Sequence, residues 1–437
     1  MIASTIGKTF LKAYNEKYGK DYSAKTFFEE VFFKIFYDDE KYLQWVTNSP
    51  FVQGVKKGHP PNASQRAEKL QKLIDKISDG ATDASVAIGY SSTDILATTS
   101  GQVSNVAINS NEEQIYASWI GGGFGIGVKG GFSMYVNEPK VLMTLFAGWQ
   151  YYRNYLTEIP NLRPNQIDTW NGQWLAHAYN KRYFNPNSPL SNFDPFNTKK
   201  DGVIELETQT WVKVVFGLSQ VFPDTTILSY IFSLGQTNKT VGFIPIVLPK
   251  VRKVIHLYKK LFGENQYLKD ANTIEKIFGD NNSIYRACER GAIGIRALEP
   301  KMIRDLMWNS DKAINYKPND DEQVVSFRTY KIWILAMLNN DQLQKLSEEI
   351  VQLFLNYESS SERGKTTKSR AIENLMKSKS ADTFLQELLG VAEEATAEEG
   401  LKLLELIKEV NKLTGDNFKR FLVLLKLQYT IAKKQYS

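Results

Sequence analysis

The distribution of proline and glycine is the sequence feature that most constrains this fold. All 14 prolines lie at or before Pro318, and only four of the 28 glycines follow it. Because both residues interrupt helices and favour turns, their loss predicts a change to nearly continuous helix. We therefore expect two domains in this chain of 437 residues. They are a mixed body over residues 1–319 and a helical domain over residues 320–437.

The net charge of the chain also changes near residue 320. Residues 320–437 carry 17 Lys+Arg and 18 Asp+Glu, a net charge of −1. The whole chain has 54 Lys+Arg and 48 Asp+Glu. The first 319 residues therefore hold 37 Lys+Arg and 30 Asp+Glu, a net charge of +7. A mild excess of this kind permits an anionic partner such as nucleic acid but does not require one.

The C-terminal part has the periodicity of amphipathic helices. Apolar residues recur at spacings of three and four over 343–357, and again over 403–429. The linkers between the helical stretches are short, which favours antiparallel neighbours and predicts a bundle of four or five helices. Asp416 is placed to cap the last helix.

The body mixes the two kinds of pattern, so the predicted class is α+β, with short antiparallel strands and helices before the all-α bundle. Helices are expected over 9–18, 24–46, 63–77, 138–156 (with Pro139 in the first turn) and, strongly basic, 250–261. Short strands are expected over 84–90, 92–99, 103–109, 114–120, 203–216 and 241–248.

Rare residues argue against most enzyme classes. One cysteine, Cys288, excludes disulfide frameworks and multi-cysteine zinc sites, and the three histidines are far apart in sequence. We expect Cys288 to be a core residue of a helix, and His177 and His256 to be packed among apolar neighbours. No catalytic or phosphate-binding motif with its required context is present. The sequence therefore predicts no enzyme, no metal and no cofactor.

Residues 121–131 form an unusually glycine-rich segment. Gly125, Gly127 and Gly130 have the spacing G-x-G-x-x-G of a dinucleotide-binding loop. That motif should open a helix and precede an acidic residue about 20 positions on, and neither feature is present. Two interpretations remain: a hairpin whose backbone approaches nucleic acid with Lys129 as the charge, or a plain flexible hairpin.

Two loops carry amides and hydroxyls on tight turns. Side-chain amides hydrogen-bond base edges, and a side chain on a rigid turn can wedge against a base pair. Asn and Gly also occupy turns for backbone reasons alone, so the loops permit both interpretations. The DNA-reading candidates, including the hairpin lysine, are Gln102, Ser104, Asn105, Lys129, Gln236, Asn238 and Lys239.

Three basic clusters are candidates for contacts with a nucleic-acid backbone. Clustered lysine and arginine give salt-dependent affinity without sequence information, although a single cluster is commonly just a solvated surface. The candidates are Lys181 and Arg182, then Lys250, Arg252 and Lys253, and finally Arg363, Lys365, Lys368 and Arg370.

An α+β body followed by a helical bundle resembles the large subunit of type I CRISPR surveillance complexes (Cascade), especially the type I-B-like large subunits. The stretch 416–429, DNFKRFLVLLKLQY, is similar to the terminal helix of those subunits. Asn137-Glu138-Pro139 leading into Phe146-Ala147-Gly148-Trp149 is a second, shorter similarity. Many type I-B large subunits carry paired C-x-x-C zinc motifs, which a single cysteine cannot form, so the chain departs from them there.

The resemblance implies a non-catalytic role in an RNA-guided complex. A CRISPR RNA reads sequence by base pairing, while the large subunit reads a short motif (the PAM) in duplex DNA and promotes strand separation. The bundle then helps to hold the displaced strand. The implied partners are the CRISPR RNA, target DNA, the backbone and guide-end-binding subunits, and a recruited helicase-nuclease or transposition factor.

Two alternatives belong to other functional classes. One is a stand-alone nucleic-acid-binding or scaffold protein, and the other is a nucleotide-binding enzyme that uses the glycine-rich segment. Neither a signal peptide nor a membrane-spanning run of about 20 apolar residues is read, so a cytoplasmic location and no membrane partner are expected.

Overall fold

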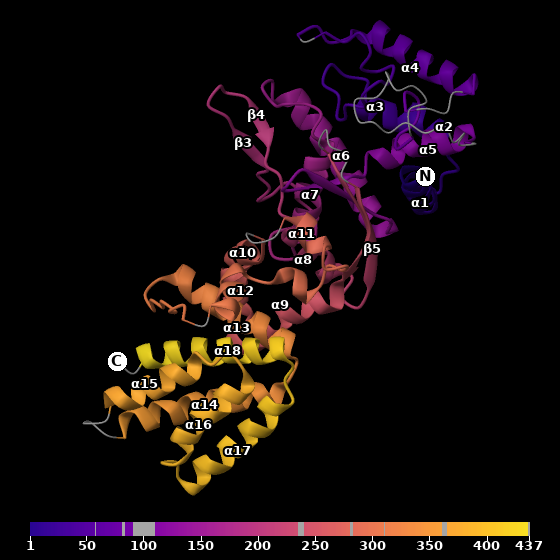
Figure 1. Cartoon of the computed structure of the whole chain (residues 1–437). Coiled ribbons are helices and arrows are strands. Elements are labelled where there is room, and N and C mark those ends of the chain that lie inside the picture. The colour runs from indigo at the N-terminus through magenta and orange to yellow at the C-terminus, as the bar shows by residue number, and fades with distance from the viewer. Residues whose placement is uncertain are drawn as a thin grey trace. The chain divides into compact units, whose positions relative to one another are not determined.

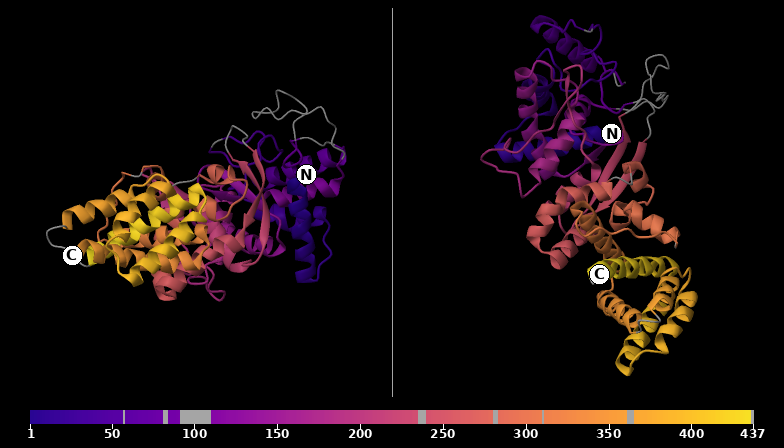
Figure 2. Two further views of the ribbon diagram at one scale, coloured as in Figure 1. Left: turned by 60° about the horizontal axis from the view of Figure 1, so that its bottom comes forward. Right: turned by 90° about the vertical axis from the view of Figure 1, so that its left-hand side faces the viewer.

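The computed structural model describes residues 1–56, 58–80, 84–90, 110–234, 240–279, 283–309, 311–360 and 365–435. The chain forms two compact units, Met1–Leu248 and Pro249–Ser437 (Figures 1 and 2). The expected 319/320 boundary lies inside the second unit. The α+β class is confirmed: two antiparallel sheets occur among the helices, and the chain ends in a run of helices.

Helices α1 (Ile2–Tyr18) and α5 (Glu112–Gly122) cross at their glycines. A Cβ on Gly7 would lie 1.9 Å from the carbonyl oxygen of Ala117, and one on Gly121 would lie 1.8 Å from that of Ala3. The two backbones therefore touch where neither residue has a side chain. The strand expected over 114–120 is wrong, because this segment is the body of α5. Its first turn carries a capping box between Asn111 and Gln114.

Aromatic side chains fill the core beside these helices. The helix expected over 24–46 is shorter and irregular: α2 (Ala24–Phe27), a π-helical turn (Phe28–Phe32) and α3 (Phe33–Phe36). The π turn keeps its aromatic residues directed inward, so Phe28 and Phe32 are both completely buried. Phe32 stacks on Phe36 with ring centroids 4.0 Å apart.

A four-stranded antiparallel sheet follows in the order β1-β2-β5-β6. Its strands are β1 (Ile126–Val128), β2 (Phe132–Val136), β5 (Thr226–Ser233) and β6 (Thr240–Val247), the last confirming the strand expected over 241–248. The long strands β5 and β6 lie side by side (Figure 2). A smaller sheet pairs β3 (Phe196–Thr198) with β4 (Ile204–Leu206).

The four other predicted strands have different outcomes. Residues 84–90 form turns and bends, so that prediction is wrong. Of 203–216, only β4 is a strand, because Thr210 caps the helix α8 (Trp211–Val221). The strands expected over 92–99 and 103–109 lie outside the described residues.

The other predicted helices of the first unit are confirmed. They are α4 (Ala63–Ser78) and α6 (Pro139–Glu158), which has Pro139 as its first residue. Helix α7 (Ile167–Ala178) packs against β1. A Cβ on Gly125 would lie 1.9 Å from Asp168 Oδ1, and one on Gly172 would lie 2.2 Å from the carbonyl oxygen of Gly127. The glycine-rich segment thus serves close packing between helix and strand.

Apart from an isolated bridge at Ile293, the described secondary structure of the second unit is helical. Six elements precede the bundle: α9 (Leu248–Phe262), α10 (Glu264–Gly279), α11 (Ile284–Cys288), the 3₁₀ helix η3 (Ile295–Leu298), α12 (Lys301–Trp308) and α13 (Asp321–Leu338). The basic helix expected over 250–261 is therefore confirmed by α9. None of the helices in the described ranges combines the length and the apolar character needed to cross a bilayer.

The range predicted for the bundle, 320–437, holds α13 and five further helices within the described residues, one helix more than the upper limit of the four or five expected (Figure 1). The five further helices are α14 (Asp341–Ser359), α15 (Lys365–Met376), α16 (Ala381–Ala392), α17 (Ala397–Asn411) and α18 (Gly415–Gln435). Leu346, Ile350, Leu406 and Phe421 belong to one continuous core. Asp416 is not the cap of the last helix, because α18 begins one residue earlier and Asp416 lies in its first turn.

The glycine crossing gives a direct test of the packing. Gly7→Ala should destabilise the first unit by about 1–3 kcal/mol, because the new methyl meets backbone that cannot turn aside. The matched control is Gly390→Ala in α16, whose Cβ meets nothing within 4 Å. It should stabilise the bundle by about 0.5–1 kcal/mol through helix propensity. Chemical denaturation of the two variants measures both values, and equal effects would contradict this packing.

Candidate nucleic-acid interface

Most of the predicted DNA-reading residues lie outside the described residues. These are Gln102, Ser104, Asn105, Gln236, Asn238 and Lys239, together with Arg363 of the bundle cluster. Lys365 begins α15. The roles assigned above to these residues and to Lys365 stay predictions.

Lys129 lies at the tip of the predicted hairpin, between β1 and β2. Its side chain is 56% exposed and its Nζ lies 3.4 Å from Glu207 Oε1. Gly130 and Gly131 have φ of 103° and 76°, the left-handed region that a tight turn requires and glycine tolerates. The segment continues into β2 instead of a helix, and Asp168 occupies the space beside Gly125. A loop wrapped around a phosphate would need that space.

Lys181 and Arg182 lie in the turn after α7, and both are exposed. The Arg182 guanidinium carbon lies 4.7 Å from the centroid of the Tyr183 ring. The backbone N–H of Arg182 donates to Asn180 Oδ1 at 3.0 Å, which fixes the turn. A guanidinium beside an exposed aromatic ring suits contact with a phosphate and a neighbouring base.

Helix α9 carries the strongest of the predicted clusters. Its 15 residues, LPKVRKVIHLYKKLF, include five Lys and Arg and no acid. Val251, Val254 and Tyr258 are buried on one side, which turns Arg252, His256 and Lys260 to solvent at intervals of four residues. The expectation that His256 is packed is therefore wrong, because its side chain is exposed between Arg252 and Lys260.

Other cations of α9 are bound within the second unit. Lys253 is half-buried and its Nζ donates to the side chain of Asn339. Lys259 Nζ lies 2.7 Å from Glu264 Oε1. Lys250 is exposed in the first turn of α9. The cationic surface of α9 comprises the exposed Arg252 and Lys260, with His256 between them, and Lys250 at the start of the helix.

The bundle cluster is divided. The Lys368 side chain is only 12% exposed, pairs with Glu394 and donates to Ser360 Oγ at 2.7 Å. Its Nζ also lies 4.6 Å from the Tyr357 ring centroid. Lys368 thus holds the end of α14 to α15, whereas Arg370 is exposed.

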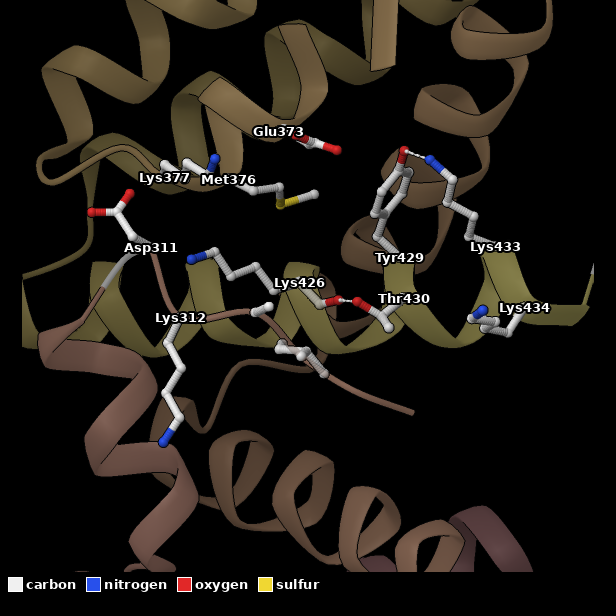
Figure 3. A pocket seen from close by; sticks show the side chains of 12 residues that line it. Asp311, Lys312, Glu373, Met376, Lys377, Lys426, Tyr429, Thr430, Lys433 and Lys434 are labelled. Carbon is white, nitrogen blue, oxygen red and sulfur yellow. Dashed lines mark hydrogen bonds between the residues drawn. The ribbon is translucent and has the colours of Figure 1, made fainter. Parts of the chain in front are cut away.

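A pocket that sequence reasoning missed lies between α15, α18 and the loop before α13 (Figure 3). Its volume is about 430 Å³. Five lysines line it together with apolar and acidic groups; the lining residues include Asp311, Lys312, Glu373, Met376, Lys377, Lys426, Tyr429, Lys433 and Lys434. A lysine inside the apolar run FLVLLKLQY is the sequence signal that marks it.

Lys426 crosses the pocket. It is 8% exposed, and its side chain extends toward Asp311 and Lys377 (Figure 3). Burial lowers its pKa to about 8; the nearby Asp311 opposes this shift and Lys377 adds to it. On the other side, Lys433 Nζ lies 2.7 Å from Glu358 Oε1, and Tyr429 Oη donates to Glu358 Oε2 at 2.6 Å.

Cys288 and His177 lie in the core, whereas His59 and His256 are exposed. Cys288 is buried on α11, as expected, and burial raises the pKa of its thiol to about 12. His177 is buried beside Phe193, with its Nε2 2.8 Å from the Pro189 carbonyl oxygen, and burial lowers its pKa. Within the described ranges, no three His, Cys, Asp or Glu side chains are grouped to hold a metal ion.

Comparison with known proteins gives no relative: no family model, curated protein or solved structure matches this chain. The arrangement of its side chains is therefore the basis on which function is argued.

The buried lysine predicts a pH-dependent stability. The pKa of Lys426 falls from 10.5 in the unfolded chain to about 8 on folding, so the unfolded state binds more protons between these values. Because of Lys426, the free energy of unfolding therefore rises with pH between about 8 and 10.5. Lys426→Met should raise the free energy of unfolding by about 2–3 kcal/mol at pH 7, and by less than half of that at pH 9.5. Urea denaturation at both pH values measures the difference in the free energy of unfolding between the variant and the parent chain. A difference that does not change with pH would contradict the prediction.

Proposed function

We propose that this chain is the non-catalytic large subunit of a type I Cascade complex guided by a CRISPR RNA. In this role it recognises the PAM in duplex DNA, promotes strand separation and helps to hold the displaced strand. The observation that carries the proposal is the acid-free cationic surface of α9. A helix with charges of one sign facing solvent and an apolar opposite side suits contact with a phosphate backbone.

Two further features support the assignment. The α+β class followed by a terminal bundle is the architecture that the resemblance implies. Each unit also has its own exposed basic residues: Lys181 and Arg182 in the first, and the α9 surface in the second. Backbone contacts of this kind position DNA without reading its sequence, which leaves sequence reading to guide pairing and to the PAM-side loops.

Removing the α9 charges tests the proposal. In the assembled complex, Lys250→Gln, Arg252→Gln and Lys260→Gln together should weaken binding of target duplex to the same degree for every sequence. The slope of log affinity against log salt should fall by about one per lost phosphate contact. Complex assembly should be unchanged, because these side chains face solvent.

The matched control removes three exposed lysines elsewhere, with Lys8→Gln, Lys20→Gln and Lys345→Gln. It should leave the affinity and the salt slope close to those of the parent complex. An α9 variant that binds target duplex as the control does would remove this surface from the interface. Tight binding of ATP or NAD by the chain, measured by calorimetry, would instead favour a nucleotide-dependent function.

A further inference from the structure

We propose that a groove along α18 binds a single strand of nucleic acid, with Trp308 stacking on a base and lysines of α18 and the α15–α16 connection contacting phosphates. The groove is formed by two adjoining hollows of the second unit, which share Lys426. Assigning its occupant to the displaced DNA strand rests on the proposed function, whereas the binding itself rests on the contacts that follow.

Trp308 is the aromatic surface of the groove. It ends α12 and is 68% exposed, although a tryptophan at a helix end ordinarily packs against its own fold. Lys419 Nζ lies 4.0 Å from the centroid of the Trp308 ring, which holds a positive charge directly beside the aromatic surface. Exposed indole next to a cation is the pairing that binds a base together with its phosphate.

Lysines on α18 extend this contact along the helix. Lys419, Lys426 and Lys433 are seven residues apart, so they lie on one side of α18 over about 21 Å. Lys419 and Lys426 line the smaller hollow, of about 170 Å³, and Lys426 and Lys433 line the larger one. The row of three lysines on α18 therefore lines both hollows of the groove.

The connection between α15 and α16 supplies the opposite wall. Lys377 lines the larger hollow and Lys379 the smaller one, and both are exposed. The two linings together contain seven lysines and the acids Asp311 and Glu373.

The surplus of positive charge remains after the internal ion pairs are counted. Asp305 pairs with Lys312 at 3.2 Å and Glu358 pairs with Lys433 at 2.7 Å. Seven lysines against four acids give these groove residues a net charge of +3. A local excess of this kind draws a polyanion to the groove and not to the bundle as a whole.

The shape favours a single strand over a duplex. Met376, Ile314 and Tyr429 give the larger hollow an apolar part that a sugar or an unpaired base can cover. A stacking platform contributes only when bases are unstacked, because the faces of paired bases are occupied by their neighbours. A small anion such as inorganic phosphate would leave Trp308 without a role.

The experiment measures binding of a fluorescent oligo-dT to the full chain. Trp308→Ala should weaken binding roughly 5- to 100-fold through loss of stacking, and Trp308→Phe should restore part of it. Lys377→Gln with Lys419→Gln should lower the salt slope by about 1.4, since each lost contact with a single strand contributes about 0.7. A duplex of the same length should bind more weakly and be indifferent to Trp308→Ala.

The matched controls are Leu401→Ala, whose side chain is also 68% exposed, and Lys345→Gln with Lys408→Gln, which removes two exposed lysines of α14 and α17. Both should bind as the parent chain does. Groove variants that bind oligo-dT within twofold of the parent would overturn the proposal. Equal losses of oligo-dT affinity in the control variants would also overturn it, as would occupation of the groove by inorganic phosphate alone.

This result is independent of the test on α9. If the groove variants bind normally while the α9 variant loses target duplex, the groove proposal fails and the proposed function stands. If the groove variants lose oligo-dT while the chain forms no RNA-guided complex, the groove is a single-strand site of another kind of protein.

Discussion

Helix α18 buries Phe418 and the run from Phe421 to Tyr429, it contacts α12, α13, α14 and α15, and the second unit is organised around it. Burial on several sides supplies most of the stability that a long apolar helix contributes, because the gain scales with the area removed from water. The same burial holds Lys426 inside the protein at an electrostatic penalty. The helix therefore both forms the bundle core and fixes the lysine row in position.

Polar contacts tie the end of α18 to the bundle. Glu358 of α14 accepts hydrogen bonds from Tyr429 and Lys433. Burial alone would raise the pKa of Glu358, but the donations from these two side chains outweigh it, so that the carboxylate stays charged and the pKa falls. The paired carboxylate thus holds the side chains of Tyr429 and Lys433 against α14 at the end of α18.

Much of the fold was predictable from local patterns, and the failures have physical reasons. Proline loss and helical periodicity predicted the bundle, and α9 was visible from its amphipathic charges. Helix α5 was mistaken for a strand because residues 115–122 are buried on every side, which removes the periodicity. The glycine-rich segment is visible in the sequence, but its packing partner Asp168 lies about 40 residues further along the chain.

The candidate site was less predictable than the fold. Lys250 and Arg252 of α9 and the Lys181–Arg182 pair are exposed where the sequence indicated cations, whereas Lys368 pairs with Glu394 from the turn after α16. The seven-residue spacing of Lys419, Lys426 and Lys433 is present in the sequence, but only tertiary packing brings Trp308 to Lys419. Side chains that meet across elements give no local signal.

The central claim is that this chain works with a guide RNA. Its most direct test is to purify the chain from cells that express it naturally and to sequence the RNA that stays bound after a high-salt wash. The proposed function predicts one population of short RNAs with a shared repeat-derived end and differing guide segments. A chain that carries no RNA, or RNA of random sequence and length, would contradict it.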